Sequence, residues 1–203
     1  MIDTFLRPPA GAGEVLADVL RVLGVGSTVL AAVLFGPVQL GVFALALLGL
    51  VAPRFLGVRP AVDVATGVVL LLASWASALD LYVSVPVVDV PMHLLLNGLV
   101  AGLALLLLRR TRVVPALPRT ATVVLTTALG CTAGVLWEIG EWAGNSFLDA
   151  SIYVGYADTI GDLTVGGLGS LFAGLVMPWF AAESRWRGRT AESADTGAAV
   201  PVA

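Results

Sequence analysis

The chain has 203 residues, of which 58% are hydrophobic and only 12% are charged. Its mean hydropathy of +0.96 exceeds what a surface in water permits, so the composition excludes a soluble globular protein and predicts one membrane domain. The formal net charge of -3, with few and scattered basic residues, excludes nucleic acid as a partner. Cys131 stands alone, so one chain can form neither a disulfide framework nor a thiolate metal site.

The apolar stretches predict six membrane-spanning helices. The first stretch, residues 22–53, is too long for one span and contains Gly36-Pro37. Proline removes a helix hydrogen bond and disfavours helix in the residue before it, so we expect two helices and a tight turn here. Residues 184–203 are small and polar and are expected to form a disordered cytoplasmic tail. The predicted fold is an all-α transmembrane bundle in a single domain, residues 1–183, with helices at about 14–35, 38–56, 61–79, 90–108, 120–143 and 159–181.

The arginines predict the orientation of this bundle, since the chain contains no lysine. They occur near the start of the first helix, between helices 2 and 3, between helices 4 and 5, and after helix 6. The other three connections have none. By the positive-inside rule, both termini are cytoplasmic and the protein is a multi-pass protein of the cell membrane. The arginines are Arg7, Arg21, Arg54, Arg59, Arg109, Arg110, Arg112, Arg119, Arg185, Arg187 and Arg189.

Small residues spaced by four predict where helices approach one another closely. They are Gly98 and Gly102, Gly130 and Gly134, and Gly166, Ser170 and Gly174.

Ionisable residues recur at helical spacing inside the apolar segments. Asp89 and His93 are four apart, Glu138 and Glu141 three apart, and Asp158 and Asp162 four apart. Each spacing places the pair on one helix face, about 5–6 Å apart. Helix 4 begins outside, helix 5 ends outside and helix 6 begins outside, so we expect all three pairs at the outer leaflet. Asp80 and Asp149 add two more acids on that side, which makes seven acids and the only histidine.

Such a cluster cannot stay fully ionised on its own, because like charges repel and removal from water adds a further cost. A bound divalent cation relieves both. Carboxylates and imidazole suit zinc, manganese, magnesium or calcium. The predicted metal ligands are Asp89, His93, Glu141 and Asp162, and the predicted general base is Glu138 or Asp158.

Structural explanations compete with the functional one for several residues. Asp89 and Asp158 precede their helices and could be N-caps, with Asp162 favoured by the helix dipole. His93 could be a hydrogen-bonded packing residue. Trp75, Trp137 and Trp142 are expected to be interface anchors. Glu138 and Glu141 have no such structural explanation, because two acids in the last turns of an apolar helix stabilise nothing unless they are paired.

The motifs around these residues resemble the VanZ-like and YjdF-like group of small bacterial membrane proteins. The resemblance rests on Asp89-xxx-His93 followed by Gly98, on the run WEIGEW, and on Asp158-xxx-Asp162 followed by a glycine-rich segment. It covers residues 80–177, about half of the chain. It implies a role at the bacterial cell envelope, in the inner membrane, connected in some members with glycopeptide susceptibility, and supplies no established reaction.

Three functions are compatible with these observations. The first is a metal-dependent hydrolase or transferase that acts on a lipid-linked substrate at the outer leaflet. Any phosphate there would be held by the metal and by helix N-termini, because that side has no arginine or lysine. The second is a transporter that is coupled to protons or divalent cations. The third is a non-catalytic envelope scaffold with a structural ion. Membrane lipids are the other expected partners.

Overall fold

The computed structural model describes residues 1–182 and is helical throughout, with no strand in that range. The predicted tail at 184–203 lies outside the described residues. The elements in chain order are α1 (Ile2–Leu6), α2 (Ala12–Phe35), α3 (Pro37–Leu56), α4 (Pro60–Ala78), α5 (Leu81–Ser84), the 3-10 helix η1 (Pro86–Val88), α6 (Asp89–Arg110), α7 (Arg119–Phe147), α8 (Tyr156–Leu175) and α9 (Met177–Ala181).

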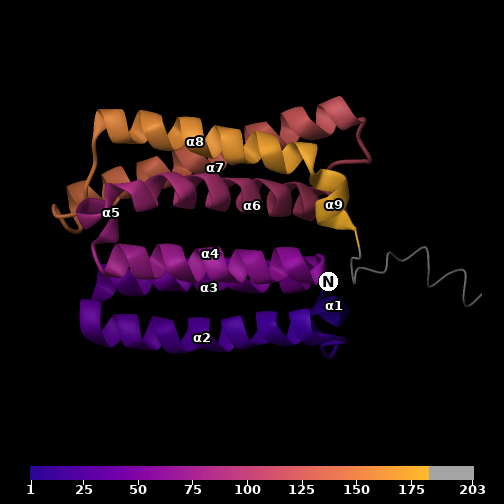
Figure 1. Cartoon of the computed structure of the whole chain (residues 1–203), viewed down its shortest axis with the longest axis horizontal. Coiled ribbons are helices and arrows are strands. Elements are labelled where there is room, and N and C mark those ends of the chain that lie inside the picture. The colour runs from indigo at the N-terminus through magenta and orange to yellow at the C-terminus, as the bar shows by residue number, and fades with distance from the viewer. Residues whose placement is uncertain (183–203) are drawn as a thin grey trace, which may run out of the picture.

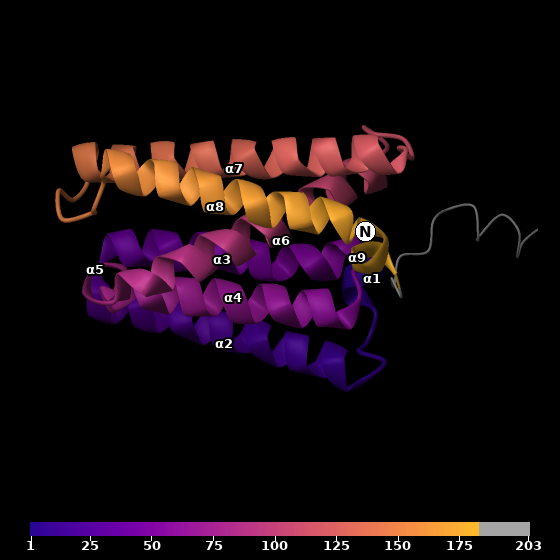
Figure 2. The same ribbon diagram turned by 45° about the horizontal axis from the view of Figure 1, so that its top comes forward.

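The long helices form an all-α bundle of two halves, α2–α4 and α6–α8, as Figures 1 and 2 show. The polytopic all-α prediction is thus confirmed. Within residues 1–182, five helices are long and apolar enough to cross a membrane, namely α2, α3, α4, α6 with η1, and α7. The sixth predicted span, α8, runs beside α6 and α7 but is less apolar, because it contains two aspartates and five glycines. The count of six spans stays a prediction.

Several element boundaries differ from the predicted ones. The chain does reverse at Gly36, whose φ of 84° suits glycine, between the end of α2 and the start of α3. However, α7 continues one turn beyond residue 143, and the connection at 80–88 contains α5 and η1. The last predicted helix, 159–181, is interrupted at Val176. Pro178 explains this break, because its ring lacks an N–H and clashes with the carbonyl one turn back.

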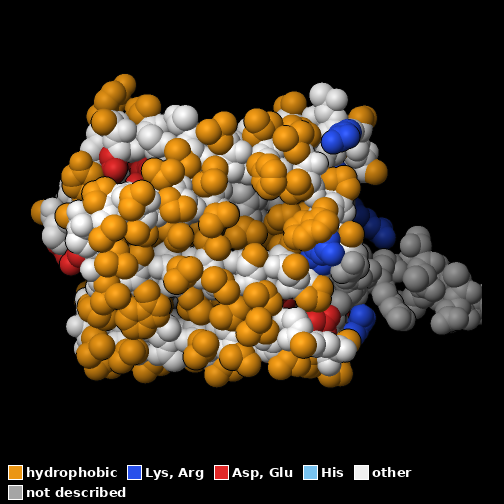
Figure 3. Space-filling view, in the orientation of Figure 1, with side chains coloured by type: hydrophobic (Ala, Val, Ile, Leu, Met, Phe, Trp, Pro, Cys, Tyr) orange, Lys and Arg blue, Asp and Glu red, His pale blue; other side chains and the backbone are white. Residues whose placement is uncertain are grey.

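Arginines gather at one end of the bundle, where the N-terminus and α9 also lie (Figures 1 and 3). The N-terminus and α9 lie at the same end, which requires that the chain crosses the membrane an even number of times. That this end is cytoplasmic remains a prediction from the positive-inside rule. Acidic side chains are visible at the opposite end in Figure 3. The connections between α4 and α6 and between α7 and α8 lie there.

Helices α6, α7 and α8 pack through small residues. A Cβ on Gly169 of α8 would lie 1.9 Å from the Leu94 carbonyl oxygen of α6, and a Cβ on Gly98 would lie 2.8 Å from the Gly169 carbonyl oxygen. A Cβ on Gly130 of α7 would lie 1.8 Å from the hydroxyl of Ser170. Glycine is therefore required for these helices to approach as they do. The small-residue spacing had singled out Gly98, Gly130 and Ser170, but not Gly169.

Trp75 is not an interface anchor. Its ring packs edge-on against Phe35 and Phe43, and its indole N–H donates to the Ser27 hydroxyl at 3.2 Å. It contributes to a small core between α2, α3 and α4.

Candidate functional site

Asp89, His93 and Asp162 form a compact cluster at the end of the bundle away from the arginines. His93 Nε2 lies 3.3 Å from Asp89 Oδ1 and 3.8 Å from Asp162 Oδ1. One potential ligand atom from each residue lies within 4.8 Å of the other two. The side chains are 22%, 15% and 9% exposed for Asp89, His93 and Asp162, so the cluster is largely enclosed.

The glycine contact between α6 and α8 brings this cluster together. Asp89 and His93 stand one turn apart on α6, and Asp162 enters from α8. Gly169 lies two turns beyond Asp162 and touches the carbonyl of Leu94, which directly follows His93. A larger side chain at this contact would hold the two helices apart, and the three ligand atoms with them.

The N-cap interpretation of the two aspartates is not supported by the geometry. The cap position of α6 is Val88 and that of α8 is Gly155, and neither helix has a side-chain cap hydrogen bond. Asp89 and Asp158 instead lie inside the first helical turns. Asp89 is therefore free to contact His93.

The fourth predicted ligand, Glu141, lies beside the cluster and not within it. It interacts electrostatically with His93 and Asp162, and the Trp137 indole lies within hydrogen-bonding reach of its carboxylate. The compact group of potential ligands comprises Asp89, His93 and Asp162 without Glu141. Glu141 is thus placed to enter the cluster only if its side chain turns.

The two predicted bases flank the same region. Glu138 lines a shallow hollow of about 330 Å³ between α7 and α8, which Val135, Ile139, Trp142, Val154, Thr159 and Leu163 complete. Asp158 is in the first turn of α8 and interacts electrostatically with Asp89 and Glu138. Glu138 thus faces the hollow, whose lining includes none of the three cluster residues, and Asp158 interacts with both Glu138 and Asp89.

The prediction that seven acids converge on one site includes two acids, Asp149 and Asp80, that lie outside the compact group of ligands. The carboxylate of Asp149 accepts hydrogen bonds from the backbone N–H and the hydroxyl of Ser151, in a turn of its own. These bonds lower the pKa of Asp149. Asp80 is exposed at the start of α5 with a φ of 53°. Neither residue belongs to the compact group of ligands.

Tyr82 of α5 is a member of the site that the sequence analysis missed. Its hydroxyl donates to the Ala73 carbonyl oxygen at 3.1 Å. Burial, followed by the negative charges of Asp89, Glu141 and Asp162, raises the pKa of Tyr82 well above its usual range. The Tyr82 hydroxyl therefore stays neutral beside the cluster, and its hydrogen bond to Ala73 joins α5 to α4. The signal that could have found it is a lone tyrosine in the short connection before Asp89.

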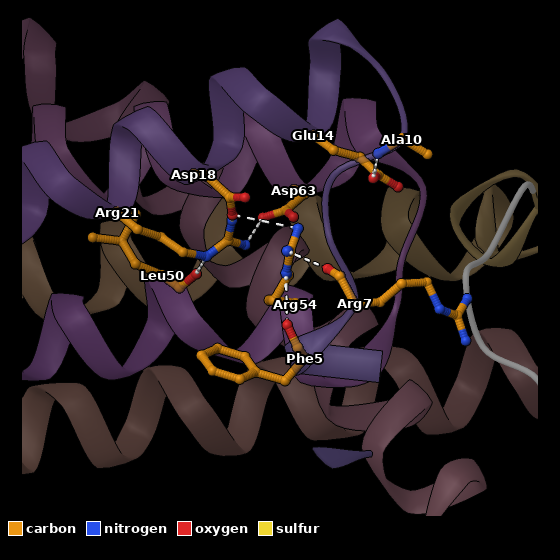
Figure 4. A network of polar contacts seen from close by, with 9 residues as sticks. All are labelled: Phe5, Arg7, Ala10, Glu14, Asp18, Arg21, Leu50, Arg54 and Asp63. Carbon is orange, nitrogen blue, oxygen red and sulfur yellow. Dashed lines mark hydrogen bonds and ion pairs between the residues drawn. The ribbon is translucent and has the colours of Figure 1, made fainter. Parts of the chain in front are cut away.

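A second polar network, at the arginine-rich end, was also missed. Arg21 of α2 forms ion pairs with Asp18 and with Asp63 of α4, and its Nε donates to the Leu50 carbonyl oxygen at 3.0 Å (Figure 4). The Arg21 and Asp63 side chains are only 12% and 8% exposed. An acid and a base inside two different apolar helices were the signal for this pair.

Arg54 extends this network to the N-terminal segment. Its Nη1 lies 3.3 Å from Asp18 Oδ1, while its Nε and Nη2 donate to the carbonyl oxygens of Phe5 and Arg7 (Figure 4). The ring of Phe5 also stacks on that of Phe55 at 4.3 Å. The network therefore has an evident structural role, because it joins α1, α2, α3 and α4.

The comparisons with known proteins agree with the membrane assignment. The family model described as predicted membrane protein (DUF2238) matches residues 15–183. The chain belongs to this family. DUF2238 is the YjdF-like group, so that part of the resemblance is confirmed, whereas nothing in the comparisons supports the VanZ-like part. No curated protein and no solved structure matches the chain. Membership of DUF2238 establishes a membrane protein with transmembrane helices and assigns no reaction.

Proposed function

We propose that Asp89, His93 and Asp162 bind a divalent metal ion and that the chain is a metal-dependent hydrolase or transferase of the bacterial cell envelope. The observation that supports this most is the meeting of an imidazole and two carboxylates from two helices within 4.8 Å. Two oxygen ligands and one nitrogen suit zinc or manganese, and magnesium if water completes the shell. Catalytic metal sites commonly have three protein ligands and an open position.

Glu141 and Glu138 have separate roles in this proposal. Glu141, next to the cluster, compensates the charge of the ion or adds a fourth ligand. Glu138 accepts a proton from the attacking water or hydroxyl, since it lies on the hollow where a substrate would enter. Asp158, on the opposite helix, is the other candidate for this role. A metal held by Asp89, His93 and Asp162 would polarise the bond under attack.

A lipid-linked substrate fits the hollow that Glu138 lines, at the same end of the bundle as the cluster. Apart from Glu138 and Thr159, the lining side chains are apolar, and Ile139 and Trp142 are exposed on the outside of the bundle. A hollow between two helices of a membrane bundle is open to acyl or prenyl chains from the side. No arginine or lysine of residues 1–182 lies at this end, so the metal would carry the interaction with a phosphate.

Transport is the second function we considered. The packing of α6 on α8 next to the cluster does not favour it. Helices α6 and α8 touch backbone to backbone at Gly98 and Gly169, one to two turns from His93 and Asp162. Neither helix is broken at the cluster, whereas ion sites in transporters commonly use broken helices.

The enzyme and transport proposals can be separated with two assays on the purified chain. With zinc or manganese present, we expect phosphate release from farnesyl diphosphate or a phosphatidic acid. Glu138→Gln should abolish this release and leave the bound metal unchanged. The proposal is overturned if neither lipid phosphate is hydrolysed while the wild type, but not His93→Ala, carries manganese into proteoliposomes.

A further inference from the structure

The connection between α6 and α7 surrounds a second hollow, at the arginine-rich end of the bundle. It has a volume of about 440 Å³ and is widely open to the surroundings. Among the residues that the structure describes, its lining combines two arginines with an apolar wall and includes no acid. The lining residues are Arg109, Arg112, Val114, Pro115, Ala116 and Leu117.

The two arginines are held in place by the end of α6. The Arg109 Nη2 donates to the Thr122 hydroxyl at 2.8 Å, which fixes the guanidinium against α7. The buried Nε of Arg109 has no acceptor within residues 1–182. Arg112 has a φ of 63°, and its turn is held by hydrogen bonds from the N–H groups of Val113 and Val114 to the Leu108 carbonyl oxygen.

The charge of this hollow comes from the arginine side chains. The end of α6 contributes the negative end of a helix dipole and the start of α7 the positive end, and these oppose each other. Two guanidinium groups then leave a net positive site. Guanidinium binds phosphate in two-point geometry, while the wall of Val114, Pro115 and Leu117 suits hydrocarbon.

We propose that this hollow binds the headgroup of an anionic phospholipid. The phosphate lies against Arg109 and Arg112, and the glycerol and first methylene groups lie against the apolar wall. A free phosphate ion would use only the arginines, and a zwitterionic lipid would bring an unpaired ammonium group to a site without an acid. The site is separate from the Asp89, His93 and Asp162 cluster, at the other end of α6.

The proposal is tested by titrating short-chain phosphatidylglycerol into the full chain, held in a zwitterionic detergent. Saturable binding is expected, with phosphatidylcholine of the same chain length much weaker. Arg109→Gln and Arg112→Gln should each weaken binding about fivefold, the usual contribution of one basic residue near an anionic lipid. Arg119→Gln is the matched control, because it removes the same charge from the start of α7, next to this connection, but Arg119 does not line the hollow.

Ala116→Trp separates a shaped site from general attraction to positive charge. Ala116 is exposed, so tryptophan can fill the hollow without disturbing the bundle and without changing the charge. We expect it to weaken phosphatidylglycerol binding at least tenfold. Equal losses for all three arginine variants with no loss for Ala116→Trp would overturn the proposal in favour of diffuse attraction. Inorganic phosphate that competes at the affinity of the lipid would overturn the lipid headgroup as the ligand.

Discussion

Substituting Gly169 by alanine tests whether the contact between α6 and α8 positions the metal cluster. The new Cβ would lie 1.9 Å from the Leu94 carbonyl oxygen, whereas ordinary contact begins at 3.4 Å. This oxygen belongs to the backbone and cannot rotate away. The helices must therefore separate locally by about 1.5 Å, the difference between these two distances.

This separation should reduce both stability and metal binding. Overpacking of this kind costs about 1–3 kcal/mol, offset by up to about 1 kcal/mol because alanine favours helix over glycine. Metal–ligand distances tolerate only about 0.2 Å, so moving Asp162 relative to His93 should weaken zinc binding although every ligand remains.

Thermal melting and zinc titration in detergent measure the two effects. Gly167→Ala is the matched control on the same helix, because its Cβ would meet the Cys131 sulfur at an ordinary 3.5 Å. The control should melt at or above the temperature of the wild type and bind zinc equally well. If Gly169→Ala behaves like this control in both assays, the positioning role of the backbone contact is refuted.

Three further predictions concern other parts of the chain. Arg21→Met or Asp63→Leu alone should lower the free energy of unfolding by about 3–5 kcal/mol, and the double variant should recover most of it, as a double-mutant cycle of melting curves will show. The pKa of Tyr82 is raised in the folded state, so the unfolded chain ionises first and stability should fall as pH rises above about 10. Tyr82→Phe should remove that part of the fall, and an unchanged pH profile would contradict the burial of this hydroxyl. Reporter fusions after Arg112 should read cytoplasmic and fusions near Asp149 extracytoplasmic, and a cytoplasmic signal near Asp149 would remove the basis for an outer site.

The sequence was sufficient for the membrane class and for much of the cluster. Hydropathy identified the long helices because burial in lipid requires about 20 apolar residues. The spacing of Asp89 and His93 predicted their contact because a helix repeats its face every three to four residues. Arginine-rich connections alternate with connections that lack arginine, and this alternation gives the direction of each helix. It therefore predicted that Asp162 lies at the same end of the bundle as Asp89 and His93.

Contacts that depend on how a helix is rotated about its own axis could not be predicted. Spacing within α7 says that Glu138 and Glu141 share a face, but only the packing of α7 on α8 decides that Glu141 lies beside the ligands and Glu138 on the hollow. The pairing of Arg21 with Asp63 depends in the same way on how α2 and α4 face each other. The break before α9 could have been predicted from the sequence, because a proline such as Pro178 interrupts a helix.

The central claim is that Asp89, His93 and Asp162 bind a divalent metal, and melting with and without metal tests it most directly. The wild type, Asp162→Asn and His93→Ala are melted in chelator and then with added zinc or manganese, with Asp149→Asn as the control for an acid outside the cluster. We predict that metal raises the melting temperature of the wild type and the control but not of the two variants, and that metal affinity increases with pH as protons are displaced. In chelator, Asp162→Asn should melt at or above the temperature of the wild type, because a costly enclosed charge is gone. Equal melting of the wild type with and without metal, together with a clear loss of stability in both variants, would contradict the metal site.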